Sequence, residues 1–238
     1  MRLERRRTWW LVLLVSAALG LGLAPTLGEA VSFDLTVEFS GATAPSGSPP
    51  WGTITFTDLG LGIVQVEFEA NLQSSTEFIS EWSFNLDPSF DPNNLLFAFI
   101  SGNDADVIAT GADAFQADGD GKFDVQFEWT GSSAGDRLDG TETSVYSITC
   151  TLCSGFNASS FDFTSATGGG QGVFHTAAHV QGIGPSAGLS GWVGDGGTGG
   201  EGGIGGEQVP APATLVFLGL GLVGLGARQA IRRLRQRA

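Results

Sequence analysis

Basic residues are scarce in the middle of this 238-residue chain. Only Lys122 and Arg137 lie between Ala30 and Val209, whereas 23 acidic residues occupy the same stretch, which gives it a formal charge of −21. Nucleic acids and anionic lipid headgroups are bound by clusters of Lys and Arg that neutralise phosphate. The composition therefore excludes nucleic-acid binding and favours divalent cations, cationic partners or simple solubility.

Cysteine, histidine and tyrosine are also rare. The chain has 2 Cys, 2 His and 1 Tyr, against 37 Gly and 17 Phe. Gly, Ser, Thr and Asp supply turns, while Phe, Val, Ile and Trp favour pleated surfaces. No 12-residue window has a convincing 3.6-residue apolar period, so amphipathic helices are not expected. The composition is typical of an all-β extracellular domain.

Apolar and polar residues alternate in several segments of the chain. A period of two buries one face of a strand and leaves the other in water. The alternating segments are 31–39, 64–69, 82–86, 123–129 and 146–152. The continuous apolar run at 95–100 predicts a central strand that is buried on both faces. Together these patterns predict an antiparallel β-sandwich of jelly-roll type over residues 31–194, whose strand order the sequence does not give.

Residues 1–30 have the three parts of a secretory signal peptide. A basic start with four arginines is followed by an apolar run at 9–24, and Gly28 and Ala30 place small residues at −3 and −1 of a cut after Ala30. We therefore expect export and a mature chain that begins at Val31. An uncleaved membrane anchor is the alternative.

The C-terminal end consists of a Gly-rich linker at 195–208 and a tail at 209–238. The tail contains an apolar stretch, 213–227, whose helix would measure about 22 Å. Extension to residue 231 brings it close to the roughly 30 Å of the hydrocarbon core, and following positive charge holds that end in the cytoplasm. We predict a membrane-spanning helix. It is preceded by Val209, Pro210, Ala211 and Pro212 and followed by Arg228, Arg232, Arg233, Arg235 and Arg237.

The Pro-x-Pro motif, the Gly/Leu-rich span and the terminal arginine cluster, in this order, resemble the PEP-CTERM sorting signal of Gram-negative bacteria. Ala211 stands where Glu is usual, so the motif is a variant. The resemblance implies that the export machinery carries the protein through the inner membrane and that an exosortase recognises and cleaves the tail. It also implies a final site at the cell surface or in the extracellular polysaccharide matrix. A plain C-terminal anchor is the alternative.

Asp118, Asp120 and Asp124 lie in a Gly-rich loop with the oxygen ligands that calcium prefers. The complete EF-hand pattern fails, because Lys122 occupies its fifth position and no Glu stands at its twelfth. Calcium is therefore the one cofactor that we consider for this chain. A solvated acidic turn before the next strand is the alternative.

Cys150 and Cys153 are spaced C-x-x-C in a chain that is bound for an oxidising compartment. A redox pair sits at the N-terminus of a helix, whereas Cys150 ends a predicted strand. A small structural disulfide is therefore predicted, provided that the chain turns there to bring the two Cα atoms within about 7 Å. Free thiols and a redox or metal site are the alternatives.

No catalytic constellation stands out. His175 and His179 are four residues apart but lack the Glu of H-E-x-x-H. The G-x-S-x-G matches at 131–135 and 184–188 lack the helix that follows a nucleophile elbow. We therefore expect a structural or interaction protein rather than an enzyme. A calcium-assisted carbohydrate-binding module is the first alternative, and a secreted hydrolase is the second.

Overall fold

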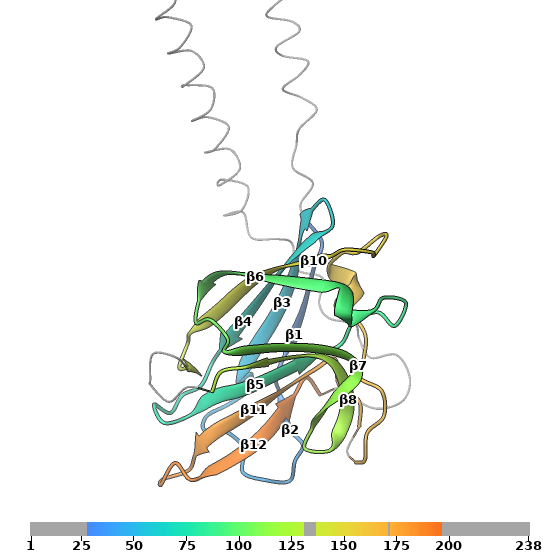
Figure 1. Ribbon diagram of the computed structural model, residues 1–238. Coiled ribbons are helices and arrows are strands. Elements are labelled where there is room, and N and C mark those ends of the chain that lie inside the picture. The colour runs from blue at the N-terminus through green and yellow to red at the C-terminus, as the bar shows by residue number, and fades with distance from the viewer. Residues whose placement is uncertain (1–27, 131–136, 171, 197–238) are drawn as a thin grey trace, which may run out of the picture. The chain divides into compact units, whose positions relative to one another are not determined.

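The computed structural model describes residues 28–130, 137–170 and 172–196, which form two antiparallel sheets and two short 3-10 helices (Figure 1). This confirms the prediction of an all-β antiparallel sandwich, and the jelly-roll type stays a prediction. Within the described ranges, no helix is long and apolar enough to cross a membrane. The membrane-spanning helix predicted for the tail lies outside them.

The first sheet has five strands in the order β1-β3-β4-β10-β6. Its strands are β1 (Ala30–Asp34), β3 (Gly52–Gly60), β4 (Ile63–Ala70), β10 (Thr143–Cys150) and β6 (Leu95–Gly102). The helix η1 (Pro92–Asn94) precedes β6, and η2 (Ala158–Phe161) follows β10 and contacts β1 and β3.

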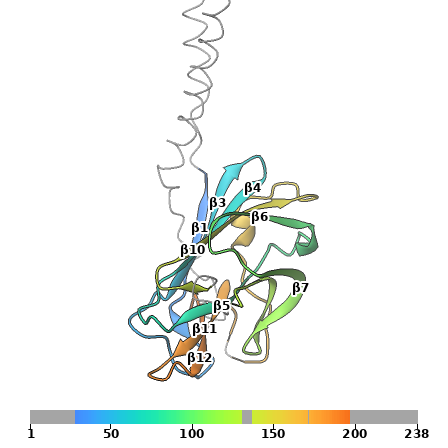
Figure 2. The same cartoon turned by 60° about the vertical axis from the view of Figure 1, so that its left-hand side comes forward.

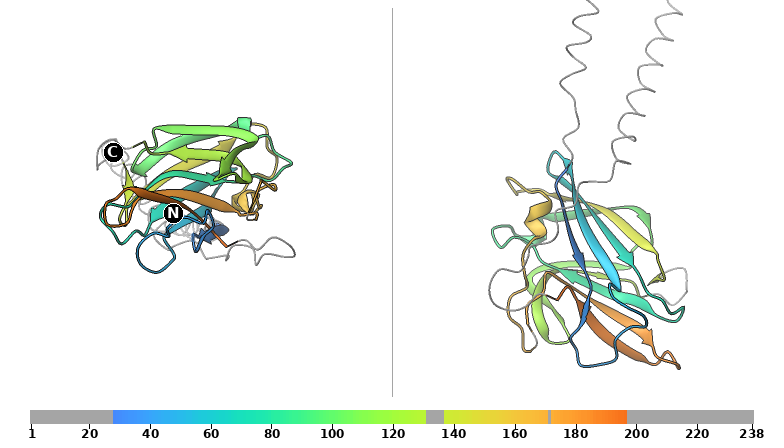
Figure 3. Two further views of the ribbon diagram at one scale, coloured as in Figure 1. Left: turned by 90° about the horizontal axis from the view of Figure 1, so that it is seen from below. Right: turned by 180° about the vertical axis from the view of Figure 1, so that it is seen from behind.

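The second sheet has seven strands, six of them in the order β2-β12-β11-β5-β8-β7, and the short β9 pairs with β5. These strands are β2 (Val37–Glu38), β12 (Leu189–Gly194), β11 (Thr176–Ile183), β5 (Phe78–Phe84), β8 (Asp120–Glu128), β7 (Val107–Ala117) and β9 (Leu138–Asp139). Figure 3 shows the two sheets from below and from behind.

Strict alternation along the strands decides which side chains enter the core. In the β3–β4 pair, Phe56 lies opposite Val66 and both are fully buried, whereas the neighbouring Thr55 lies opposite Glu67 on the outer face. Cross-strand partners share a face, so one register places Ile54, Phe56, Val64, Val66 and Phe68 on the same, buried side. The predicted alternation at 64–69 is confirmed in this way.

Aromatic rings join the two sheets at the centre of the sandwich. Phe68 of β4 lies with its ring centroid 5.3 Å from Trp82, 4.8 Å from Phe127 and 5.4 Å from Trp129. All four side chains are 0% exposed. Rings at such separations pack edge-to-face or tilted, which adds to the burial of their area. The abundant Phe thus forms the main core between the sheets.

The prediction for the apolar run at 95–100 is wrong. This run lies in β6, which among the described strands pairs with β10 alone and lies at the edge of the first sheet. Leu96, Phe99 and Ile100 are 57%, 43% and 49% exposed. A strand with apolar side chains on both faces is expected at the centre of a sheet. In β6, however, Leu95 is the one residue that is buried in the described structure.

A second, smaller apolar cluster includes residues of β7, β8 and β11. Its buried members are Phe39, Ala117, Phe123, Phe174 and Ala177, and Trp192 packs against them. The β7–β8 hairpin reaches this cluster because β8 continues past the end of β5 (Figure 2).

The described fold includes residues on both sides of the predicted bounds 31–194. β1 begins at Ala30, which is 2% exposed, and the carbonyl of Glu29 accepts a hydrogen bond of 2.9 Å from Asp58 N. At the other end, Asp195 accepts hydrogen bonds from the backbone N and the ring Nδ1 of His175. Residues on both sides of the predicted boundaries therefore contribute to the fold.

Candidate functional site

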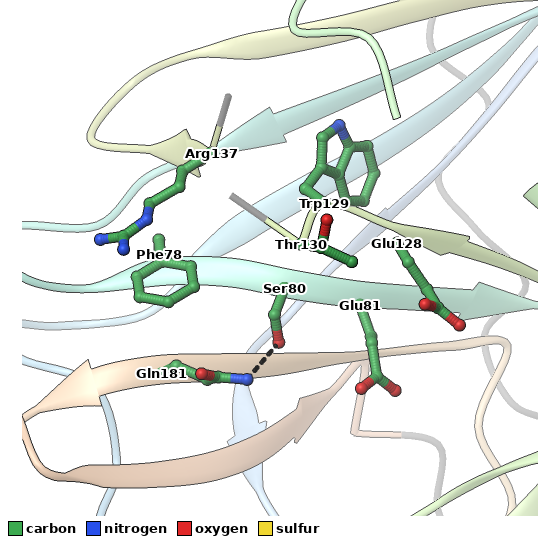
Figure 4. A pocket seen from close by; sticks show the side chains of 8 residues that line it. All are labelled: Phe78, Ser80, Glu81, Glu128, Trp129, Thr130, Arg137 and Gln181. Carbon is green, nitrogen blue, oxygen red and sulfur yellow. Dashed lines mark hydrogen bonds between the residues drawn. The ribbon is translucent and has the colours of Figure 1, made fainter. Parts of the chain in front are cut away.

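A pocket of about 460 Å³ opens on the outer face of the seven-stranded sheet (Figure 4). Strands β5, β8 and β11 supply most of its wall, and residues that follow β8 or precede β9 complete it. The lining residues are Phe78, Ser80, Glu81, Glu128, Trp129, Thr130, Arg137 and Gln181. Pockets that combine aromatic walls with a few polar groups are the usual form of small-molecule sites.

The pairing of the strands extends this pocket into a row that crosses the sheet. Glu128 of β8 lies opposite Glu81 of β5, Glu81 lies opposite His179 of β11, and His179 lies opposite Trp192 of β12. Because cross-strand partners share a face, the four side chains lie on the same outer surface. The row is the candidate site, and we call it the Trp192–Glu128 row.

The aromatic end of the row is held firmly. The rings of His179 and Trp192 are stacked with centroids 4.8 Å apart and planes at 12°. His179 Nδ1 lies 3.2 Å from Ser80 Oγ and 3.8 Å from Glu81 Oε1. Such pairs have fixed geometry, so Trp192 presents a partly exposed ring at a set position.

A β-bulge places additional polar groups in the pocket. The register between β5 and β11 shifts between His179 and Val180, which leaves Ser80 as the extra residue of β5. The amide of Gln181 donates to Ser80 Oγ at 3.0 Å (Figure 4), and the amide of Gln126 donates to Glu81 Oε2 at 3.3 Å. The bulge thus concentrates hydroxyl, amide and carboxylate groups within one surface.

Two carboxylates and one guanidinium give the pocket its charge. Glu81 and Glu128 lie directly opposite each other on neighbouring strands, which is unfavourable for like charges. The guanidinium of Arg137 lies 4.2 Å from the ring centroid of Phe78 at another part of the wall, a cation–π contact. The pocket therefore has an acidic side and an aromatic side.

Apart from His179, the residues of this site are not indicated by the sequence alone. Its residues come from four strands. Within each strand they are ordinary residues of the wet face, and no local motif distinguishes them. The one local signal is the pair Gln126 and Glu128, which flank the buried Phe127 on the wet face of β8. That signal marks an exposed face, and only the pairing of β5 with β8 and β11 shows that the polar groups converge.

The three aspartates predicted to bind calcium have different structural positions in and after the β7–β8 turn. Asp118 and Gly119 have φ of 51° and 81° and form the two-residue turn between β7 and β8, as expected for a type I′ Asp-Gly hairpin. Asp120 is 4% exposed and lies against Gly170. Asp124 accepts hydrogen bonds from Leu86 N at 3.0 Å and Asp113 N at 2.9 Å.

No group of three or more His, Cys, Asp or Glu that could hold a metal ion occurs in the described part of the chain. The two histidines have different partners. His179 stacks on Trp192. His175 stacks on Phe33 with ring centroids 4.5 Å apart, and its Nδ1 lies 2.6 Å from Asp195 Oδ2. The geometry therefore offers no support for a site shared by both histidines.

The structure joins Cys150 and Cys153 in a disulfide with their Cα atoms 5.4 Å apart, where the chain turns after β10. The G-x-S-x-G match at 184–188 forms the turn between β11 and β12, with no helix after it. The other match, at 131–135, lies outside the described residues.

The predicted processing site at Ala30 is the first residue of β1, whereas Pro210, Ala211, Pro212 and the arginine cluster lie outside the described ranges. Of the comparisons with known proteins, the family model described as the PEP-CTERM protein-sorting motif matches residues 208–233. No curated protein and no solved structure matches the chain. The chain therefore carries a PEP-CTERM sorting signal, which implies export, anchoring in the membrane for sorting, and processing by an exosortase.

Proposed function

We propose that the exported domain is a polysaccharide-binding interaction module of the cell surface or the extracellular matrix, and that it binds through the Trp192–Glu128 row. The proposal joins two features of the chain. The sorting signal supports delivery to the outside of the inner membrane. The row supplies a surface that suits a glycan.

The observation that carries the proposal is the combination of the stacked Trp192 and His179 with the adjacent polar groups of the pocket. A sugar ring has apolar C–H faces and a rim of hydroxyls that both donate and accept hydrogen bonds. Aromatic side chains suit the faces, while carboxylates accept from hydroxyls and amides do both. The calcium-assisted variant of this function has less support, because the described residues include no group of three or more His, Cys, Asp or Glu that could hold a metal ion.

Binding without catalysis fits a pocket on an open sheet surface. A secreted glycoside hydrolase is the second candidate, because Glu81 and Glu128 are cross-strand neighbours. Side chains in such pairs have Cβ atoms about 4.5–5.5 Å apart, and retaining enzymes use carboxyl groups about 5–5.5 Å apart. Release of reducing ends from polysaccharide by wild-type protein, and its loss in Glu128→Gln, would favour this candidate over the first.

The proposed function is tested by affinity electrophoresis of the processed protein in gels that contain the polysaccharide of the producing cells. Trp192→Ala should weaken binding by roughly tenfold or more, as truncation of a central aromatic contact does. Leu61→Ala is the matched control, because Leu61 is a fully exposed apolar residue between β3 and β4 of the other sheet. Equal retardation of wild type and Trp192→Ala would refute the proposal.

A further inference from the structure

We infer that the glycan bound by this pocket carries free amino groups, as a partly deacetylated amino-sugar polymer does. The inference rests on the proposed function, since it names the class of polysaccharide that the same face would bind. It is carried by the position and the partners of two carboxylates, Glu81 and Glu128, inside a pocket that also has aromatic walls.

The acidic side of the pocket has unused capacity to bind a cation. Among the described residues, the carboxylate of Glu128 has neither a hydrogen-bond nor an ion-pair partner. Glu81 has the neutral amide of Gln126 at 3.3 Å and the ring of His179 at 3.8 Å. An ammonium group between Glu81 and Glu128 would remove their mutual repulsion and donate to both.

The charge of the surroundings points in the same direction. In the described part of the chain the basic side chains are Lys122 and Arg137, and only Arg137 lines the pocket, where it lies over Phe78. The stretch between Ala30 and Val209 has a formal charge of −21. Such a field attracts polycations and repels uronic-acid or sulfated polymers, so an anionic glycan is disfavoured.

The dimensions suit a short stretch of polymer rather than one sugar. Trp192 lies on β12 and Glu128 on β8, which are separated by three strand spacings, or about 14 Å at roughly 4.8 Å each. A glycan that crosses the strands would contact the partly exposed Trp192 at one end. It would place an amino group between Glu81 and Glu128 at the other end, in the pocket that Phe78 and Ser80 also line.

The test compares three β-1,4-linked hexamers: of glucosamine, of N-acetylglucosamine and of glucose. Isothermal titration calorimetry of the processed protein with each hexamer should show roughly tenfold or more tighter binding of the glucosamine hexamer, the gain expected for a charge-assisted hydrogen bond. Glu128→Gln and Glu81→Gln should each remove this preference. Glu69→Gln should keep it, because it makes the same charge change on β4 of the other sheet, where Glu69 is exposed.

Each result separates the two proposals. Equal affinity for the glucosamine and glucose hexamers, with both weakened by Trp192→Ala, would overturn the inference and leave polysaccharide binding in place. An equal loss of the preference for the glucosamine hexamer in Glu69→Gln and Glu128→Gln would also overturn the inference, because the attraction would then come from the overall charge. Failure of every hexamer and of the cells' own polysaccharide to bind would overturn both.

Discussion

Tyr146 provides a quantitative test of the packing, because it is the only tyrosine in the chain. Its side chain is 1% exposed, and its hydroxyl donates to Asp104 Oδ1 at 2.8 Å and accepts from Ala105 N at 2.5 Å. Burial raises the pKa of Tyr146 from 10.0 to about 12, and the negative charge of Asp104 adds to the effect. The phenolate would lose its hydration and lie beside a carboxylate.

The direction of the pH dependence follows from this pKa. Between pH 10 and pH 12 the unfolded chain has released the phenolic proton and the folded domain has kept it. The contribution to stability is therefore complete below pH 10 and is lost as the pH rises to about 12. The difference corresponds to roughly 2–3 kcal/mol of unfolding free energy.

Near-ultraviolet difference absorbance of the phenolate measures this ionisation directly. The folded protein should titrate with a midpoint near 12, and the protein in concentrated urea with a midpoint near the ordinary value of about 10. Circular dichroism recorded in parallel verifies that the domain is still folded. Tyr146→Phe should remove the loss of stability between pH 10 and pH 12. A midpoint near 10 in the folded protein would refute the description of a buried, hydrogen-bonded Tyr146.

Four further variants test other parts of the structure by urea unfolding. Ile148→Ala, at a fully buried position of β10, should lower the free energy of unfolding by about 2–5 kcal/mol. Ile100→Ala should lower it by about 1 kcal/mol or less, because Ile100 is 49% exposed. Equal losses would place β6 in the interior. Burial and a neighbouring carboxylate raise the pKa of Glu67, so Glu67→Gln should stabilise the domain by roughly 0.5 kcal/mol at pH 7. At pH 3 the wild-type carboxyl is protonated, and a gain in stability that persists there would contradict this cause. Replacement of Cys150 and Cys153 by Ser opens a loop of sequence separation 3 and should lower the free energy of unfolding by about 2 kcal/mol. If reductant changes the stability of wild type and variant equally, the disulfide is contradicted.

The faces of most strands could be predicted from the sequence, because side-chain alternation is a local property. Phe123, Val125 and Phe127 are 0% exposed, as the period of two in this segment predicts. The position of β6 could not be predicted in this way. A continuous apolar run gives no information on how many neighbours a strand has, and pairing with β10 on one side alone leaves Ile100 half-exposed.

The candidate site was beyond prediction for a related reason. It depends on strands that are distant in sequence but paired in the second sheet, so that Glu81, Glu128 and Trp192 meet on one surface. The acidic loop at 118–124 predicted a calcium site because its aspartates are close together in the sequence. The turn at Asp118 and the two amides bound by Asp124 show that such adjacency can reflect hairpin geometry.

Hydrogen exchange of the processed protein, with and without polysaccharide from the producing cells, tests the central claim most directly. Binding through the Trp192–Glu128 row predicts slower exchange of backbone amides in β5, β8 and β11, together with β12 around Trp192. It predicts unchanged exchange in β3 and β4 of the other sheet. Protection confined to β3 and β4, or no protection with saturating polysaccharide, would contradict the claim that this face is the binding surface.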